Sequence, residues 1–487
     1  MFNSLNDDND NVLVLIQLNG GNDGLNTIIP LDKYDILANV RSNVIIPQNE
    51  IITLDQNTGV HPVMTGIKSL YDDAKMAVIQ DVGYPNQNRS HFRSTDIWNT
   101  GSPAEEFWTT GWLGRYLENR FPEFPDGYPN EEQPDPFAIA LGAAVHETCQ
   151  GSGANYSIAL RDPFNLAPLA EGGSDTAPDT PYGEELEFLR SIIAQSNAYG
   201  DNVSDAANMG TNMSNLYDDD NGLAQQLKTI ALLISGGLKT KIYIANIGGF
   251  DTHANQVVGG ETTTGEHATL LASISEAVSA FQDDLALMGL EEKVITMTFS
   301  EFGRRIRSND SLGTDHGTAA PMMIFGSCIN PGLFGESPDL PDNPSIQDGV
   351  PMQFDFRSVY GSVLMDWFEV DEQEIKQILY DDFQYIPVIK SCSQTTSTTD
   401  YELGHVDTSC FPNPCEDWLT IQFTSENEHL KISIFDATGQ ELRVLTNQKF
   451  TAGEHQIKFD ASQLPAGNYY YRLQGNLKLK TKGFIKV

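Results

Sequence analysis

An apolar run followed at once by charged and imidazole side chains is the feature that most constrains this chain. Residues 294–299 read VITMTF, and a short β-branched run of this kind is typical of a strand buried in a sheet that is covered on both faces. Glu301, Arg304 and Arg305 come directly after it, and the segment TDHG at 314–317 follows on what we predict to be a loop. In open α/β sheets ligands bind beyond the carboxyl ends of the strands, so this stretch predicts a site at a sheet edge.

A second unit with the same order lies upstream. Residues 241–250 read KIYIANIGGF, an apolar strand that runs into glycines, and Asp251 and His253 follow. Like Asp315 and His316, they offer a hard oxygen and an imidazole nitrogen, the ligand mix that suits a divalent ion such as zinc or manganese. One such pair is more often a turn aspartate beside a solvated histidine. Two units separated by one long helical stretch are what neighbouring strands of a parallel sheet would present on one edge, so together they predict a metal site.

The first strand is predicted at 12–18 and runs into the glycine-rich segment NGGNDGLN. No helix with the G-x-G-x-x-G spacing follows, which argues against a dinucleotide site. Asp23 in this segment is either a ligand at the same sheet edge or an Asp-Gly turn residue.

A short helix is predicted to begin near Ser90, after a strand at 76–81. A serine at a helix start can simply cap the helix, with His91 stacked on an aromatic ring. Alternatively its hydroxyl can attack a bound anion, which the helix N-terminus favours. Arg89 and Arg93 flank the serine, and paired guanidinium groups are good clamps for phosphate or sulfate.

Length and charge bound the possible functions. The 487 residues predict two or three folding units, and the formal net charge of −38 argues against nucleic acid as a partner, because phosphate binding needs a basic surface. No apolar run approaches the roughly 20 residues of a membrane span, so we expect no transmembrane segment. The N-terminus has neither the basic nor the apolar part of a signal peptide, so a secreted protein would lack its signal in this chain.

The sequence pattern changes after a Ser- and Thr-rich linker. We predict an α/β domain at 1–390, the linker at 391–410, and a small all-β sandwich of short alternating strands at 411–487. Within the α/β domain, helices are predicted at 184–198, 223–234, 267–288 and 356–368, and surface loops at 103–114, 120–136 and 201–221.

The five cysteines show no zinc-finger spacing, and their odd number leaves at least one unpaired. In an oxidising compartment Cys392 could pair with Cys410 or with Cys415, and the sequence does not choose between them.

Residues 12 to about 369 resemble the DUF1501 family of secreted proteins, because they contain short motifs of that family in the same order. The family is assigned to the alkaline phosphatase and sulfatase superfamily. The matching words are LNGGNDGLN, NQNRSHF, TGWLGR, GGFDTHANQ, TFSEFGRR and TDHGTA. The terminal module, with LPAGNYYYRL and KGFIKV, resembles the type A C-terminal sorting domain of the type IX secretion system of Bacteroidota. The resemblance implies a secreted or cell-surface protein with the type IX machinery as a partner.

The superfamily resemblance implies a three-layer α/β sandwich with a mainly parallel central sheet. It also implies two divalent metal ions (zinc, manganese or calcium), an alkoxide nucleophile, and an anionic phosphate or sulfate ester or glycan-type substrate. The metal ligands that it implies are Asp23 (or Asn19), Asp251, His253, Asp315 and His316, with a third imidazole from His267, His61 or His91. The catalytic residues that it implies are Ser90 as nucleophile with His91, Arg89, Arg93, Glu301 and Arg304. The arginines would bind the anionic oxygens, and Glu301 would support a ligand or pair with Arg304.

Two alternatives remain open at this point. The protein could be a surface-binding scaffold with a decayed site and one structural metal ion or calcium, because a fold alone does not fix function. A Ser-His-Asp hydrolase of carboxylic esters is disfavoured, because no G-x-S-x-G segment occurs.

Overall fold

The structure, a computed structural model, describes residues 9–165, 176–390, 392, 408–425, 429–435, 441–474 and 479–487. The chain divides into two compact units, Met1–Ser393 and Gln394–Val487, and each is described here by itself. Most of the predicted linker at 391–410 lies outside the described residues.

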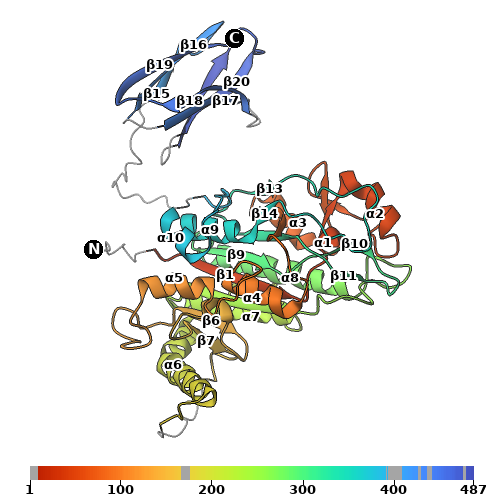
Figure 1. Cartoon of the computed structure of the whole chain (residues 1–487), viewed down its shortest axis with the longest axis vertical. Helices are drawn as coiled ribbons and strands as arrows, with labels where there is room; N and C mark the ends of the chain where they lie inside the picture. The colour runs from red at the N-terminus through yellow and green to blue at the C-terminus, as the bar shows by residue number, and fades with distance from the viewer. Residues whose placement is uncertain are drawn as a thin grey trace. The chain divides into compact units, whose positions relative to one another are not determined.

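A mixed β-sheet forms the centre of the first unit (Figure 1), and its strand order is β13-β5-β12-β9-β1-β8-β6-β7, with β14 paired to β5. Strand β1 pairs in parallel with β8 on one side and with β9 on the other, whereas β12 runs antiparallel to β9 and β5. The strands are β1 (Val12–Asn19), β5 (Met76–Gly83), β6 (Ala138–Leu141), β7 (Ser157–Leu160), β8 (Ile242–Gly248), β9 (Val294–Phe299), β12 (Ala320–Phe325), β13 (Gly332–Phe334) and β14 (Phe354–Asp355). The predicted α/β class with a mainly parallel sheet is confirmed.

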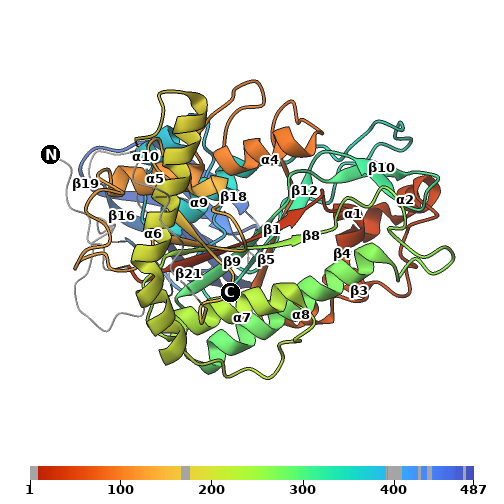
Figure 2. The same cartoon turned by 90° about the horizontal axis from the view of Figure 1, so that it is seen from below.

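Helices cover both faces of this sheet. Successive side chains of a strand point to opposite faces, so Leu13 and Leu15 join one hydrophobic core, while Val14 and Ile16 join the other. Figure 2 shows the sheet between α4, α5 and α9 on one side and α7 and α8 on the other. The helices are α1 (Gly24–Thr27), α2 (Tyr34–Val40), α3 (Thr65–Asp72), α4 (His91–Thr100), α5 (Trp112–Arg120), α6 (Pro181–Met209), α7 (Gly222–Ser235), α8 (Glu266–Leu287), α9 (Phe356–Trp367) and α10 (Glu372–Ile378).

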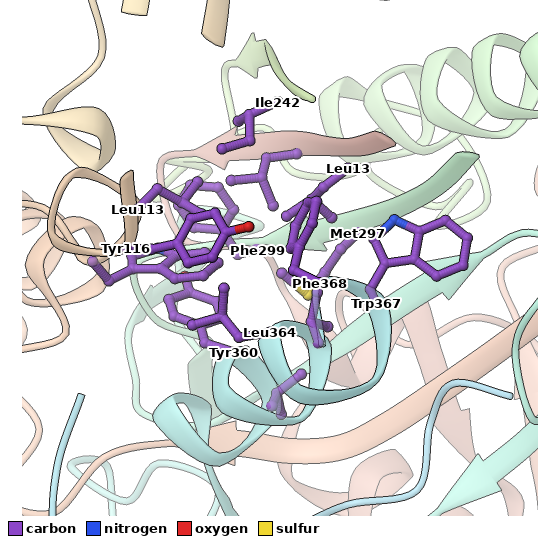
Figure 3. Packing of buried hydrophobic residues seen from close by; sticks show 14 of the residues in the cluster. Leu13, Leu113, Tyr116, Ile242, Met297, Phe299, Tyr360, Leu364, Trp367 and Phe368 are labelled. Carbon is purple, nitrogen blue, oxygen red and sulfur yellow. The ribbon is translucent and has the colours of Figure 1, made fainter. Parts of the chain in front are cut away.

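The first of these cores packs α9 and α5 against the sheet, including strand β9, whose carboxyl end precedes the predicted site. Figure 3 shows Tyr360 and Leu364 of α9 beside Tyr116 of α5, with Met297 and Phe299 of β9 behind them. Trp112 stacks on Tyr360 with a centroid distance of 4.3 Å. Since these side chains are almost fully buried, they fix the strand ends against the helices.

Two local predictions differ from the structure. The loop expected at 201–221 begins as the last turns of α6, because Val203, Ala206 and Ala207 recur at helical spacing and are buried in the second core. The TDHG segment was expected on a loop but forms β11 (Thr314–His316), which pairs antiparallel with β10 (Arg304–Ser308). A further small sheet joins β2 (Ile28–Pro30), β3 (Ile52–Thr53) and β4 (Thr58–Val60).

The disulfide prediction was wrong in both of its forms. Cys392 pairs with Cys328, with a Cα–Cα distance of 5.2 Å, whereas Cys410 and Cys415 are free and pack in the second unit. The partner of Cys392 therefore comes from its own α/β unit, at a point just after β12.

The second unit is an all-β sandwich of two antiparallel sheets, β15-β16-β19 and β18-β17-β20-β21. Its strands are β15 (Thr408–Phe411), β16 (Trp418–Ser425), β17 (His429–Phe435), β18 (Glu441–Lys449), β19 (Gly453–Asp460), β20 (Gly467–Gln474) and β21 (Leu479–Lys486). Alternating residues of β16, Leu419, Ile421 and Phe423, are buried between the sheets, as the period-two pattern predicts.

Among the helices that the structure describes, none is both long and apolar enough to span a membrane.

Candidate metal centre

Three imidazoles from distant parts of the chain meet near the carboxyl ends of β8 and β9. His91 is the first residue of α4, His253 follows β8, and His316 ends β11. The Nε2 atoms of His253 and His316 lie 2.8 Å apart, and the ring centroids of His91 and His316 are 4.3 Å apart. We call these three residues together with Asp251 the histidine cluster.

The hydrogen bonds behind each ring fix its tautomer. Nδ1 of His91 lies 2.8 Å from Glu301 Oε1, and Nδ1 of His253 lies 3.0 Å from Asp315 Oδ1. Nδ1 of His316 lies 2.7 Å from the backbone oxygen of Arg89. All three partners can only accept, so Nδ1 of each ring donates; in a neutral ring Nε2 then carries a lone pair, and the contacts of His316 Nε2 with His253 Nε2 and Asp251 Oδ1 need a proton or another cation between the atoms.

Asp251 completes the cluster. Its Oδ1 lies 3.3 Å from Nε2 of His91, 3.2 Å from Nε2 of His253 and 3.3 Å from Nε2 of His316. Partial burial acts to raise the pKa of Asp251, but the hydrogen bond and charge of Arg304 outweigh it, helped by the nearby histidines, and the pKa falls to about 2. Asp251 is therefore an anion at neutral pH.

Facing lone pairs repel unless a cation lies between them. Within the described residues Nε2 of His91 is buried and has no hydrogen-bond partner, although buried polar atoms normally have one. Burial lowers the pKa of His316, together with the charges of Arg304 and His91, which disfavours a proton as that cation at neutral pH. Ligand atoms of His91, Asp251 and His316 all lie within 4.8 Å of one another, so a metal ion fits these residues.

The donor set indicates which metal suits the site. Imidazole nitrogens with one carboxylate oxygen are typical zinc ligands, whereas calcium takes six to eight oxygens. Glu301 and Asp315 hold two of the imidazoles from behind, an arrangement that orients metal-binding histidines. Asp315 was expected as a ligand, but its Oδ1 is engaged with His253 and Asn309, and its Oδ2 with Arg305.

A buried arginine holds the loops that carry the cluster. Arg304 donates to the backbone oxygens of Gly20, Gly21, Phe250 and Thr314 and to Asp251 Oδ1 at 2.8 Å. Its guanidinium is buried and donates from all three nitrogens to the protein, so the expectation that it binds substrate oxygens is not supported. Glu301 was expected to support a ligand or to pair with Arg304, and the contact with His91 matches the first alternative.

Close backbone approach explains one glycine of the NGGND segment. Gly20 has a φ of +121°, and a Cβ there would lie 2.3 Å from the backbone nitrogen of Asp251. Its N–H donates to Glu301 Oε1 at 2.9 Å, so the same backbone also positions the carboxylate behind His91.

Two other expected ligands lie apart from the histidine cluster. Asp23 is fully buried in an ion pair with Arg41, at 2.8 and 3.2 Å, and accepts from Gln256 at 2.6 Å. His267 is buried, with its Nε2 3.0 Å from Asn22 Oδ1, and burial lowers its pKa to about 4. The second ion of a two-metal site thus has no comparable ligand group in the described part of the chain.

The hydroxyl of Ser90 does not cap helix α4 with a hydrogen bond. Ser90 occupies the N-cap position of α4, but its side chain makes no capping hydrogen bond, and the residue is exposed. Its neighbours on either side, Arg89 and His91, both contact the cluster. Arg93 instead points to the 102–106 segment and stacks on Phe107 at 4.0 Å.

Comparison with known proteins identifies two segments of the chain. Residues 195–379 match the family described as protein of unknown function (DUF1501), and residues 409–487 match the secretion system C-terminal sorting domain. Both resemblances expected from the sequence are confirmed over these ranges, and the sorting domain indicates secretion to the cell surface. No curated protein matches the chain.

Several solved structures are similar in part. A protein of the alkaline phosphatase superfamily from Vibrio parahaemolyticus is 10% identical, with a TM-score of 0.31, and the match covers 90% of this chain and 82% of that one. The PsFucS1 sulfatase from Pseudoalteromonas sp. is 9% identical, with a TM-score of 0.36 and coverage of 93% and 84%. A DUF3244 protein with an immunoglobulin-like β-sandwich from Bacteroides vulgatus is 21% identical, covering 17% of this chain and 92% of that one, with a TM-score of 0.15. These TM-scores are below 0.5, so function is argued below from side chains.

Proposed function

We propose that this chain, with its DUF1501 segment and its secretion-sorting domain, is a cell-surface or secreted hydrolase of phosphate or sulfate esters. The metal ligands are His91, Asp251 and His316, with His253 beside them. One observation carries the proposal: three imidazoles, each held at Nδ1 by an oxygen, turn their Nε2 atoms toward one carboxylate, and the Nε2 of His91 is buried without a hydrogen bond. Such an arrangement is costly without a cation.

A bound zinc ion would lower the pKa of an attacking hydroxyl and stabilise negative charge on the ester oxygens. Ser90 is our candidate nucleophile, because it is exposed at the start of α4 between two residues that contact the cluster. Its Oγ would form a bond to phosphorus or sulfur as the bond to the leaving alcohol breaks. Water would then hydrolyse the serine ester and regenerate the hydroxyl, while the alcohol takes up a proton.

Binding of an anionic ester needs local positive charge on a protein with a net charge of −38. Arg89 is half-buried beside Ser90, and its Nη1 donates to the backbone oxygen of Gln347 at 2.8 Å. The remaining N–H groups of its guanidinium suit the oxygens of a phosphate or sulfate group. Arg89 is therefore the arginine that we expect to bind the anion.

The test measures zinc content and hydrolysis of aryl phosphate and aryl sulfate esters by the full chain. We expect zinc in the wild type, loss of both zinc and hydrolysis in Asp251→Asn, and retained zinc with at least about 100-fold lower kcat in Ser90→Ala. Asp310→Asn is the matched control, because Asp310 is exposed on the loop between β10 and β11. A wild type without zinc, or equal turnover in Asp251→Asn, would refute the proposal.

A scaffold with a structural metal ion is the second candidate, because the orphaned His91 nitrogen argues for a cation and not for turnover. This alternative predicts that zinc raises the unfolding temperature of the wild type while Ser90→Ala changes no ester hydrolysis.

A further inference from the structure

An apolar groove of about 710 Å³ lies on the loop that carries Asp251 and His253. Its lining includes Val257, Val258, Leu270 and Leu312. Val258 is 51% exposed although it is a large apolar side chain. The volume falls in the range of sites for small organic molecules, which bury mainly apolar ligand surface.

The walls of the apolar groove come from the loop that carries Asp251 and His253, from Leu312 in the loop before β11, and from the first turns of α8. Gly249 and Asn255 line the groove and flank Asp251 and His253 in sequence, and Leu312 precedes Asp315 by three residues. The backbone N–H of Asn255 donates to the oxygen of Ser311 at 3.1 Å, which ties one loop to the other. The loop that carries Asp251 and His253 is therefore tied to the loop before β11, and both contribute residues to the groove.

A side-chain amide joins the two loops a second time, directly at the cluster. Asn309 Nδ2 donates to the backbone oxygen of His253 at 2.9 Å and to Asp315 Oδ1 at 3.1 Å. A molecule in the apolar groove would thus contact loops whose positions are fixed relative to the metal ligands.

Exposed apolar side chains also occur in two other segments that are linked to the cluster. Phe92, which follows His91, is 87% exposed, and Ile346 is 68% exposed. The backbone oxygen of Ile346 accepts from Nη1 of Arg305, the same nitrogen that donates to Asp315 Oδ2. Exposed apolar side chains near a site mark it for an apolar ligand more often than single scattered ones do.

We propose that the apolar groove holds the alcohol part of the substrate, so that the preferred substrates are phosphate or sulfate esters of an aryl or long-chain alkyl alcohol. The inference rests on the proposed function, since the histidine cluster would bind the anionic head of the same molecule. Glu266 lines the groove, and its negative charge disfavours a second anionic group there. The apolar part of the ester therefore fits the groove and the charged part does not.

The test compares two phosphonates that cannot be hydrolysed, naphthylmethylphosphonate and methylphosphonate, by calorimetry on the full chain with and without added zinc. We expect the naphthyl compound to bind wild type at least about tenfold more tightly, the discrimination typical of a substituent in an apolar pocket. Val258→Asp should remove most of this advantage. Leu287→Asp is the matched control, because Leu287 is also 51% exposed but lies at the opposite end of α8.

Equal affinity of wild type for the two phosphonates, or the same advantage in Val258→Asp and Leu287→Asp, would overturn the inference. Turnover of naphthyl and methyl esters is measured in parallel and decides on the proposed function separately. Tight naphthyl binding that Val258→Asp abolishes, without any hydrolysis, would refute the hydrolase and support the groove.

Discussion

Two aspartates at the same edge of the central sheet have opposite surroundings. Asp23 follows β1 and is fully buried, with both oxygens bound by Arg41 and one also by Gln256. Asp251 follows the neighbouring strand β8, and its side chain is 49% exposed beside three imidazoles. The carboxylate of Asp23 is enclosed by its partners, whereas the carboxylate of Asp251 is paired with Arg304 on one side and lies beside three imidazole nitrogens on the other. The contrast separates a closed ion pair from the aspartate that we propose as a metal ligand.

The largest effect should come from removing the negative charge of Asp23 or of Asp251 in two separate variants. Asp23→Asn leaves Arg41 as a buried uncompensated charge, so the free energy of unfolding should fall by about 3–5 kcal/mol. Zinc affinity should stay within threefold of wild type. Asp251→Asn should abolish zinc binding and lower the stability of the metal-free protein less than Asp23→Asn does, because Asp251 is half exposed and the buried Arg304 keeps its backbone acceptors. Urea unfolding and zinc calorimetry measure both quantities, and the reverse pattern would contradict the comparison.

The next largest effect should be a loss of stability in acid, caused by the buried histidines His61 and His267. Burial lowers the pKa of His61 to about 3 and that of His267 to about 4, from an ordinary value of 6.5. The unfolded chain therefore binds more protons than the folded one below pH 6.5, and stability falls as the pH drops toward 4. Each imidazole should account for roughly 2 kcal/mol between pH 6.5 and 5.

The pH effect is checked with urea unfolding of metal-free protein at several pH values. His61→Gln should flatten the dependence, whereas the partly exposed His455 of the second unit serves as the control through His455→Gln. An unchanged slope in His61→Gln would show that the acid sensitivity lies elsewhere.

A smaller effect is expected from the carboxylate behind His91. Glu301→Gln can turn its amide so that it donates to Nδ1 and favours the wrong tautomer of the ring. Loss of such a supporting contact typically costs 10–100-fold in metal affinity, so zinc should bind 10–100-fold more weakly. Glu336→Gln, at an exposed residue away from the cluster, is the control. Equal zinc affinity in both variants would show that Glu301 does not support a metal ligand.

The smallest effect should come from replacing Arg305, which contacts the metal ligands only through Asp315. Arg305 binds Asp315 Oδ2 at 3.1 Å, and Asp315 in turn holds His253. The pair is partly exposed, so Arg305→Gln should lower zinc affinity by no more than about fivefold, in line with the 0.2–1 kcal/mol of exposed ion pairs. A loss as large as that of Glu301→Gln would mean that His253 binds the metal as directly as His91.

The sequence predicted β1, β5, β8 and β9 of the sheet and the convergence of Asp251, His253 and His316, because apolar runs that end in polar residues determine which side chains reach the sheet edge. It could not separate Asp23 from Asp251, since both follow a strand and glycines. The difference is Arg41, eighteen residues after Asp23, whose contact depends on how α2 packs. Likewise, the roles of Asp315 and Glu301 behind the rings depend on ring orientation, which no motif records. His91 was one of three options for the third imidazole, and only tertiary structure could choose it.

The most direct test of the account is the zinc stoichiometry of the purified full chain by native mass spectrometry and calorimetry. The account predicts one zinc ion per chain, no zinc in a His91→Ala/His316→Ala variant, and calcium binding much weaker than zinc binding. A wild type that binds no zinc, or a double variant that still binds one ion, would contradict it.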